Sequence, residues 1–375
     1  MKIQLHDNGK HLAFAPLSLT RAIGDLRVGI LTNVERWKLL LPNAELSFET
    51  ENYLAGKYPM TANTLVVNAC VIPTKEIALA ITSLKGNEEL VVEGSWLARS
   101  GTGEIFIEYK GELPIILNHR WDLYQMNGTI LTQDYKLLTE GRTSVQLSST
   151  NTIIGDPNQV FLEAGAKVEA AILNTTNGPI YIGENAEVME GAMVRGPFAM
   201  CEHSGVKMGA KIYGPTTLGP HCKVGGEVNN CVFQAYSNKG HDGFLGNSVI
   251  GEWCNIGADT NTSNLKNNYG RVKTYSYETR SLVQTDIQFM GLIMGDHSKC
   301  GINTMFNTAT VVGVSSNVFG AEFPDKFIPS FQWGTSGDSY NFDKAIESAN
   351  NMMARRDKQL SDDEIVILRH VSDNK

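Results

Sequence analysis

The residues best suited to chemistry lie close together in the second half of the chain. His241 stands between Gly240 and Asp242, and two asparagines follow it at Asn255 and Asn264. A neutral imidazole near pH 7 can accept a proton from a reacting group, and a neighbouring carboxylate raises its basicity. We therefore predict that His241 is catalytic; the alternatives are a polar loop residue or a subunit contact.

The other candidate side chains carry weaker signals. A lone histidine is usually structural or solvated, and we expect this of the other seven. No ligand spacing supports a metal site at His203, His221 or Cys222, so no metal centre is expected. Asn255 precedes an apolar position of a repeat, where an asparagine also serves turn geometry or an internal amide ladder.

These residues interrupt a repeat with a period of six. Such a period fits neither an α-helix nor a single strand; it predicts a solenoid in which three short strands form one triangular coil of ~18 residues. A second run in phase covers 294–318. The phase breaks at 230–246 and 262–289, and we expect both breaks to be projecting loops that carry the site. The inward positions of the first run are Ile182, Val188, Val194, Met200, Val206, Ile212, Leu218 and Val224.

The chain divides into three parts by the pattern of its residues. Residues 1–145 alternate Val/Ile-rich segments with candidate helices at Asn33–Leu41 and Lys75–Leu84, which predicts an α/β layer domain. We assign residues 146–335 to the solenoid and residues 336–375 to a helical segment.

The helical segment carries two helix signals. Asp343 can cap a helix over Lys344–Lys358, and Ser361–Glu364 is a capping box before Ile365–Val371. We expect these helices to cover the open end of the solenoid, because its last coil would otherwise expose strand edges.

Composition limits the classes of function. The 375 residues are 42% hydrophobic and 19% charged, with a formal net charge of −8. Such a chain has no general positive field for nucleic acid, so an anionic substrate would need a local basic pocket. No apolar run reaches the ~18 residues of a membrane span, and no signal peptide is evident. The six cysteines form no CxxC pair, which fits a reducing cytoplasm. We expect a cytoplasmic protein without nucleic-acid or membrane partners.

The stretch from Ser237 to Asn264 resembles the acetyltransferase half of the bifunctional glucosamine-1-phosphate acetyltransferase/N-acetylglucosamine-1-phosphate uridyltransferases. That family has a Lys-Ala-Gly-His loop, then Asn-Ile-Gly-Ala-Gly-Thr, then a Cys-Asn-Tyr-Asp-Gly loop. Here Lys-Gly-His ends at His241 and Asn-Ile-Gly-Ala begins at Asn255, at the family's spacing. The resemblance implies a left-handed parallel β-helix of hexapeptide repeats, acetyl-CoA as cosubstrate and a sugar-phosphate acceptor. Grooves between solenoid subunits further suggest a homotrimer with the site at its interface.

The resemblance also implies roles for single residues. His241 matches the general base that takes a proton from the substrate amine. Asn255 and Asn264 match side chains that hold the sugar and the acetyl group, and Ala258 matches a backbone position beside the thioester. Arg271 matches a lysine whose charge suits a sugar phosphate.

The chain departs from the family pattern in its phosphate contacts. Phe244 stands where the family has a phosphate-binding tyrosine. The basic residues of the family's preceding coils have no clear counterpart, and Lys239, Tyr236 or Arg195 are the possible replacements. The acceptor can therefore differ from glucosamine 1-phosphate.

Residues 1–145 resemble, more weakly, a divergent branch of the same family in which a shortened nucleotidyltransferase-like domain precedes the β-helix. Pro16–Arg21 is among the matching residues, whereas the usual Gly-x-Gly-Thr-Arg phosphate loop is absent. Arg21 is a candidate phosphate contact, with Asp7 or Asp25 holding Mg²⁺. A structural ion pair between Arg21 and Asp25 is an equal alternative.

Three functions are open on this basis. The first is an acetyl-CoA-dependent N-acetyltransferase of an amino-sugar phosphate, in sugar-nucleotide biosynthesis of the UDP-N-acetylglucosamine type. The second is a Mg²⁺-dependent sugar-1-phosphate nucleotidyltransferase that uses UTP or dTTP, with the β-helix as an oligomerisation platform. Both activities can coexist. The third is a scaffold without either chemistry, against which the spacing of His241, Asn255 and Asn264 argues.

Overall fold

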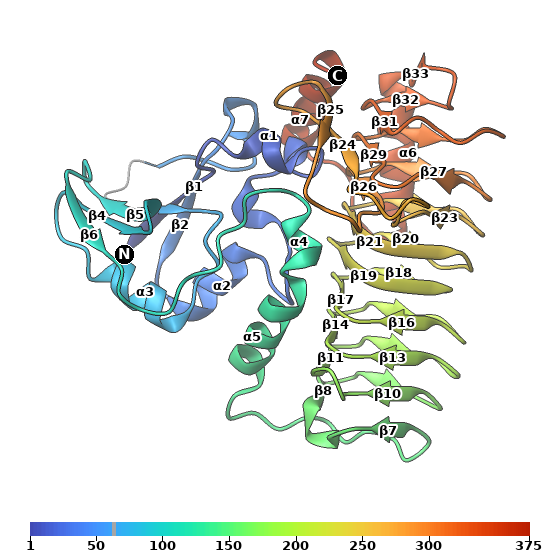
Figure 1. Cartoon of the computed structure of the whole chain (residues 1–375), viewed down its shortest axis with the longest axis horizontal. Coiled ribbons are helices and arrows are strands. Elements are labelled where there is room, and N and C mark those ends of the chain that lie inside the picture. Colours follow the sequence, from blue (N-terminus) through green and yellow to red (C-terminus); the bar gives the residue numbers. More distant parts are fainter. Residues whose placement is uncertain (62–64) are drawn as a thin grey trace.

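The computed structural model describes residues 1–61 and 65–375. An α/β domain lies beside a tall column of stacked coils (Figure 1). The column is a left-handed parallel β-helix, and two helices follow it at the C-terminus. The predicted order of an α/β domain, a left-handed β-helix and short C-terminal helices is therefore confirmed.

In the described part of the N-terminal domain, six strands form a sheet in the order β2-β1-β3-β5-β4-β6. Both β2 and β3 pair in parallel with β1, so the carboxyl ends of these three strands share one edge. The strands are β1 (Lys2–His6), β2 (Glu45–Glu49), β3 (Leu65–Asn68), β4 (Glu88–Val92), β5 (Ser95–Ser100) and β6 (Ile105–Glu108). The helices are α1 (His11–Phe14), α2 (Asn33–Leu40), α3 (Lys75–Thr82), α4 (Asp122–Gln125) and α5 (Asn127–Thr139).

The two helices predicted in this domain, α2 and α3, are present and end one or two residues earlier than expected. The start of α2 is fixed by a capping box: Thr32 accepts from the Glu35 backbone N–H, and Glu35 accepts in return from that of Thr32. Such a box satisfies two N–H groups that have no partner within the helix.

The coils of the β-helix present three faces. The first face contains β7 (Thr152–Ile154), β10 (Ile172–Asn174), β13 (Met193–Arg195), β16 (Lys211–Tyr213), and the first halves of β19 (Glu227–Phe233) and β21 (Phe244–Ile250), followed by β23 (Asn261–Thr262) and β28 (Met305–Phe306). The second contains β8 (Val160–Leu162), β11 (Ile180–Ile182), β14 (Phe198–Met200), β17 (Thr216–Leu218), the second halves of β19 and β21, then β26 (Ile293–Met294), β29 (Val311–Val312) and β31 (Phe327–Ile328). The third contains β9 (Lys167–Val168), β12 (Glu187–Val188), β15 (Gly205–Val206), β18 (Lys223–Val224), β20 (Asn238–Lys239), β22 (Asn255–Ile256), β27 (Lys299–Cys300), β30 (Asn317–Val318), β32 (Gln332–Trp333) and β33 (Asp338–Ser339).

The interior of the column is the core that the repeat predicted. All eight inward positions of the first run belong to one hydrophobic cluster, and none is more than 2% exposed. The second run, 294–318, joins the same cluster. Burying one such aliphatic side chain contributes ~1.5–3 kcal/mol, so the stacked coils stabilise one another along the whole column.

The two breaks in the repeat have different structures. Residues 263–292 leave the column as predicted, and they carry the antiparallel hairpin of β24 (Lys273–Ser276) and β25 (Ser281–Gln284). The break at 230–246 is not a projecting loop. Leu218 pairs in register with Phe233, so this coil has 15 residues instead of 18. The prediction of a first loop is wrong because a coil can lose residues at a corner and stay in the stack.

The N-terminal domain covers the second face of the column. Phe161 of β8 and Ala199 of β14 form one buried cluster with Leu131 of α5. On the neighbouring coil, the Thr217 hydroxyl donates to the Gly29 carbonyl at 2.8 Å. These contacts leave the third face open to the C-terminal segment.

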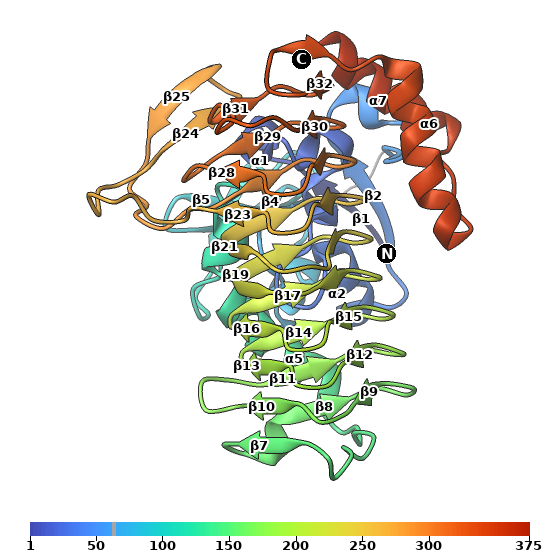
Figure 2. The same ribbon diagram turned by 90° about the vertical axis from the view of Figure 1, so that its right-hand side faces the viewer.

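The C-terminal segment packs on the side of the column. Helices α6 (Phe342–Met353) and α7 (Asp362–Asp373) lie beside the upper coils (Figure 2). They share a buried cluster with Trp253 and Phe331. This differs from the predicted cover over the open end, where β33 folds back on β32 instead. In the described residues, no helix is long and apolar enough to cross a membrane.

The caps of these helices match the sequence signals in part. The predicted capping box of Ser361 and Glu364 begins α7. Helix α6 begins at Asn341 rather than at the predicted Asp343, because the Asn341 side chain accepts from the Lys344 backbone N–H at 3.1 Å. A 3₁₀ turn at Ala354–Arg356 ends α6 five residues before the predicted Lys358.

Candidate active site

A groove of about 600 Å³ lies on the third face of the β-helix. Its floor is a row of outward-facing residues on β18, β20, β22 and β27. Lys223, Asn238, Asn255 and Lys299 follow one another in register along this row. Neighbouring parallel strands are ~4.8 Å apart, so the groove crosses several coils at nearly constant width. The turn after α6 forms the opposite wall.

The groove brings together three of the residues predicted for acyl transfer. His241 lies at the corner that follows β20, and Ala258 takes the equivalent position one coil later, since the Asp259 N–H donates to the Asp242 carbonyl at 3.1 Å. Asn255 stands on the adjoining strand, β22. His241 and Asn255 are both exposed, so a substrate in the groove can reach them. The placement fits an imidazole, an amide and a backbone position facing one ligand.

Gly257 in the floor of the groove packs closely against the backbone of the next coil. A Cβ at Gly257 would lie 2.3 Å from the Gly301 carbonyl oxygen and 2.4 Å from its carbon. We expect Gly257→Ala to lower the free energy of unfolding by about 1–3 kcal/mol, because backbone atoms must move to admit the methyl group. Gly240 is the matched control: it occupies the same position one coil earlier, and its Cβ would meet nothing within 4 Å. Urea denaturation measures both variants, and equal stability would contradict the steric argument.

Lys239 occupies an inward position beneath the candidate base. Its side chain is 1% exposed, and its ammonium donates to the carbonyls of Gly225, His241 and Asp242 at 3.0, 2.8 and 3.3 Å. Burial lowers the pKa of Lys239 to about 8, although Asp242 opposes this. The predicted substrate contact is therefore contradicted: the ammonium holds the backbone of the His241 corner instead.

Three other predicted residues lie outside this groove. The Asn264 amide donates to the Asn247 side chain at 2.7 Å, and the Phe244 backbone N–H donates to Asn261 at 2.9 Å. Arg271 lies on the projecting segment, where its exposed guanidinium pairs with Asp286 at 2.6 Å. The structure therefore does not gather Asn264, Phe244 and Arg271 with His241 within one chain, and their substrate contacts stay predictions.

Five cations in the groove were missed by the sequence reasoning. Of these, burial and the charges of Arg356, Lys207 and Arg355 lower the pKa of Lys223. Lys207, Lys223 and Lys299 lie near outward positions of the hexapeptide repeat, and this pattern could have revealed them. Arg355 and Arg356 reach the groove only because the chain folds back along the β-helix. The five are Lys207, Lys223, Lys299, Arg355 and Arg356. They supply the local basic pocket that an anionic substrate requires in a chain of net charge −8.

A column of stacked rings borders the groove. The ring centroids of Tyr236 and Trp253 are 4.0 Å apart, and the column continues through His221 and His203 at 4.9 and 4.8 Å. The two histidines thus face other rings, while Cys222 is buried inside the β-helix. Within the described ranges, no group of three or more His, Cys, Asp and Glu side chains is placed to hold a metal ion.

The residues predicted to bind a nucleotide are engaged in structural contacts. Arg21 is 3% exposed and donates to Glu252, at 2.7 Å, and to Asp296, both on the β-helix. Its predicted phosphate contact is contradicted, and so is the alternative pair with Asp25, because both partners lie in the other domain. The Asp7 carboxylate accepts from the Ile23 N–H at 3.0 Å and the Thr50 hydroxyl at 2.5 Å. Asp25 accepts from the Tyr58 hydroxyl at 2.7 Å, and burial raises the pKa of Asp25.

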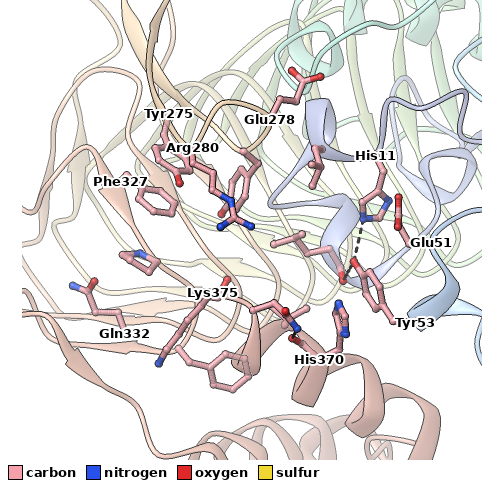
Figure 3. A pocket seen from close by; sticks show the side chains of 18 of the residues that line it. His11, Glu51, Tyr53, Tyr275, Glu278, Arg280, Phe327, Gln332, His370 and Lys375 are labelled. Carbon is pink, nitrogen blue, oxygen red and sulfur yellow. Dashed lines mark hydrogen bonds between the residues drawn. The ribbon is translucent and has the colours of Figure 1, made fainter.

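A second cavity, of about 950 Å³, opens where the N-terminal domain, the β24–β25 hairpin and α7 meet (Figure 3). His11 and Tyr53 line it beside the carboxyl ends of β1 and β2, the edge at which parallel sheets bind ligands. The Tyr53 ring stacks on His370 at 4.0 Å, and Tyr275 stacks on Phe327 at 3.5 Å. None of the predicted site residues lines this cavity.

Comparison with known proteins finds a sugar nucleotidyl transferase family, GlmU and acetyltransferases. Residues 3–143 match the family model described as a sugar nucleotidyl transferase. The bifunctional protein GlmU of Methanocaldococcus jannaschii is 33% identical over 87 residues, which are 23% of this chain and 21% of that protein. An uncharacterised acetyltransferase, YaiX, of Escherichia coli K12 is 29% identical over 164 residues, 43% of this chain and 70% of that protein. YaiX of E. coli O6:K15:H31 is 26% identical over 219 residues, 58% of this chain and 87% of that protein.

One solved structure, the polySia-specific acetyltransferase NeuO, is similar over 50% of this chain and 82% of its own. The sequence identity is 11% and the TM-score is 0.23, which is too low to support an argument.

The matches confirm the predicted resemblance at the level of the family. The chain combines a sugar nucleotidyltransferase-like domain with a β-helix, and it is similar in sequence to GlmU and to acetyltransferases. Only about a fifth of the GlmU protein is spanned, so the activity of that whole protein does not transfer directly to this chain.

Proposed function

We propose that the chain is an acetyl-CoA-dependent N-acyltransferase whose acceptor is an amino-sugar phosphate similar to glucosamine 1-phosphate. The observation that carries this proposal is the meeting of His241, Asn255 and Ala258 in one groove. Their order and spacing are those of the acetyltransferase pattern, and the similarity to acetyltransferases supports the same class. A homotrimer is the proposed assembly.

The reaction requires the protein to position the amine and the thioester, to supply a base and to stabilise the oxyanion. His241 takes a proton from the amine as the amine nitrogen attacks the thioester carbonyl carbon. The C–N bond forms, the C–S bond then breaks, and the imidazolium returns the proton to the departing thiolate. In this scheme Asn255 donates to the developing oxyanion, where a preorganised donor is most effective. Because the thioester is already activated, the step needs no metal.

The test is thiol release from acetyl-CoA with glucosamine 1-phosphate. We expect turnover by the unaltered protein and a loss of ~10²-fold or more in kcat/KM for His241→Ala, the effect of removing a general base. His119→Ala is the control, since His119 stacks on Trp121 in the N-terminal domain and lies outside the groove. An unaltered rate in His241→Ala would contradict the assignment of the base. An absence of turnover by the unaltered protein would contradict this acceptor.

A sugar-1-phosphate nucleotidyltransferase is the second candidate function. The family model over residues 3–143 favours it, as does the cavity at the carboxyl ends of β1 and β2. Its test is Mg²⁺-dependent pyrophosphate release from UTP or dTTP with a sugar 1-phosphate. An Arg21 variant would not identify a phosphate contact here, because this arginine pairs with Glu252 and Asp296 across the domains.

A further inference from the structure

The outer edge of the N-terminal sheet is apolar and unpaired. Strand β6 is the last strand of this sheet, and among the described residues only β4 pairs with it. It lies on the side of the domain away from the β-helix (Figure 1). Ile105, Phe106 and Ile107 are 55, 70 and 38% exposed. Proteins usually protect such an edge with lysine, proline or a β-bulge, and Ile105–Glu108 contains none of these.

The apolar side chains of β6 continue the core of the domain beyond its boundary. Paired residues of neighbouring strands point to the same face of a sheet, and Ile107 pairs with Leu90 of β4. Leu90 is 3% exposed and belongs to the buried hydrophobic cluster of this domain, whereas Ile107 beside it stays accessible. A further strand next to β6 would cover Ile105 and Ile107 and complete this face.

The free backbone groups of β6 restrict how a further strand can pair. The backbone N–H groups of Ile105 and Tyr109 donate toward β4, each at 2.8 Å. Because these groups alternate between the two sides of a strand, Phe106 and its even-numbered neighbours direct theirs to the open side. The hydrogen-bonded pairs of an antiparallel partner therefore fall on even-numbered positions.

Charge selects one register for the pairing of β6 with a second copy. A two-fold axis at Ile107 places Glu104 of each copy opposite Lys110 of the other. Both side chains are exposed, and neither forms an ion pair in the ranges 1–61 and 65–375. An axis at Phe106 sets Glu104 opposite Glu108, and an axis at Glu108 sets that residue opposite its own copy. Like charges directly opposite one another are destabilising, so the axis at Ile107 is favoured.

We propose that β6 pairs antiparallel with β6 of a second copy about a two-fold axis at Ile107, which joins the two sheets into one. The two Ile107 side chains then meet, and Ile105 lies opposite Tyr109 at a position where side chains are closest. Two four-residue strands are small beside the ~1,200–2,000 Å² that stable interfaces bury, so we expect an association that depends on concentration. The inference does not rest on the proposed acyl transfer.

The first experiment tests the contact and its register by disulfide formation. In Ile107→Cys the two Cα atoms across the axis are ~4.5 Å apart, within the range of a disulfide. We expect mild oxidation to convert most of the full-length protein to a crosslinked dimer. The six native cysteines are all buried and contribute little background.

Phe106→Cys is the matched control. Phe106 is the more exposed of the two side chains, but in this register its two copies lie diagonally, beyond the ~7 Å that a disulfide can span. We expect Phe106→Cys to crosslink at least ~10-fold less than Ile107→Cys. Equal crosslinking of the two variants, or none in either, would overturn the proposal.

The second experiment exchanges the charges and leaves the apolar residues unaltered. Sedimentation velocity over a concentration series measures the association. We expect Lys110→Glu to weaken it by ~5-fold or more, because both ends of the strand pair then carry like charges, and Glu104→Lys/Lys110→Glu to restore it to within ~2-fold. A stronger association in Glu104→Lys alone would assign the axis to Phe106 and overturn the proposal. An association that none of these variants changes would assign the contact between copies to another surface, with the same consequence.

Discussion

Replacing Arg21 with methionine should lower the free energy of unfolding by about 3–5 kcal/mol, the effect of breaking a buried ion pair from one side. The guanidinium donates to Glu252 at 2.7 Å and to Asp296, and the Thr20 hydroxyl also donates to Asp296, at 2.6 Å. Arg21→Met leaves both carboxylates without their cation at the interface of the two domains. Denaturation followed by circular dichroism measures the change.

A matched control separates burial from charge. Lys75 pairs with Glu140 at 2.7 Å, but both side chains are largely exposed, so Lys75→Met should have little measurable effect. If Arg21→Met were as stable as Lys75→Met, the pair across the domains would not contribute to the fold. A separate, earlier transition for the N-terminal domain would show that Arg21 couples the domains rather than stabilising either one.

This ion pair also connects the domains to the candidate site. Glu252 precedes Asn255 by three residues, and Asp296 precedes Lys299 by three, each along the same coil. The Glu252 backbone N–H donates to Asp296 at 2.8 Å, which joins the two coils. A lower acyltransferase rate in Arg21→Met would therefore reflect the position of the groove floor, and Arg21 is a positioning residue in this scheme.

The sequence alone predicts the parts of the fold that follow from the hexapeptide repeat. Each coil must bury one side chain every six residues, and the eight positions from Ile182 to Val224 obey this rule without exception. The same constraint placed His241, Asn255 and Ala258 at equivalent points of neighbouring coils. The spacing therefore predicted their meeting in one groove, because parallel coils keep their register.

The remaining contacts depend on partners far away in the sequence. Lys239 stands in an inward column, level with Val224, and only the carbonyls around it explain why a cation is tolerated there. Arg21 reaches carboxylates more than 200 residues away. Arg355 and Arg356 join the groove only because α6 packs along the side of the column. No periodicity encodes these three outcomes, so a single sequence did not reveal them.

Acid should also destabilise the folded protein through the buried His297. Burial lowers the pKa of His297 to about 4, and its Nδ1 has no hydrogen-bond partner in the part of the chain that the structure describes. The unfolded chain binds a proton near pH 6.5, whereas the folded chain stays neutral until about pH 4. Between these values the unfolded state holds more protons, so the free energy of unfolding falls as pH falls, by about 3 kcal/mol in total.

The variant His297→Gln should remove this loss between pH 6.5 and 4. Stability falls further at lower pH through Glu252. Burial raises the pKa of Glu252, but Arg21 and Lys57 lower it by more. The stability that such a lowered pKa provides disappears as the carboxylate is protonated. His241→Gln serves as the control for the substitution itself, because this side chain is exposed. Urea denaturation at stepwise pH gives the comparison. An unchanged slope in His297→Gln would show that a group other than His297 takes up the proton.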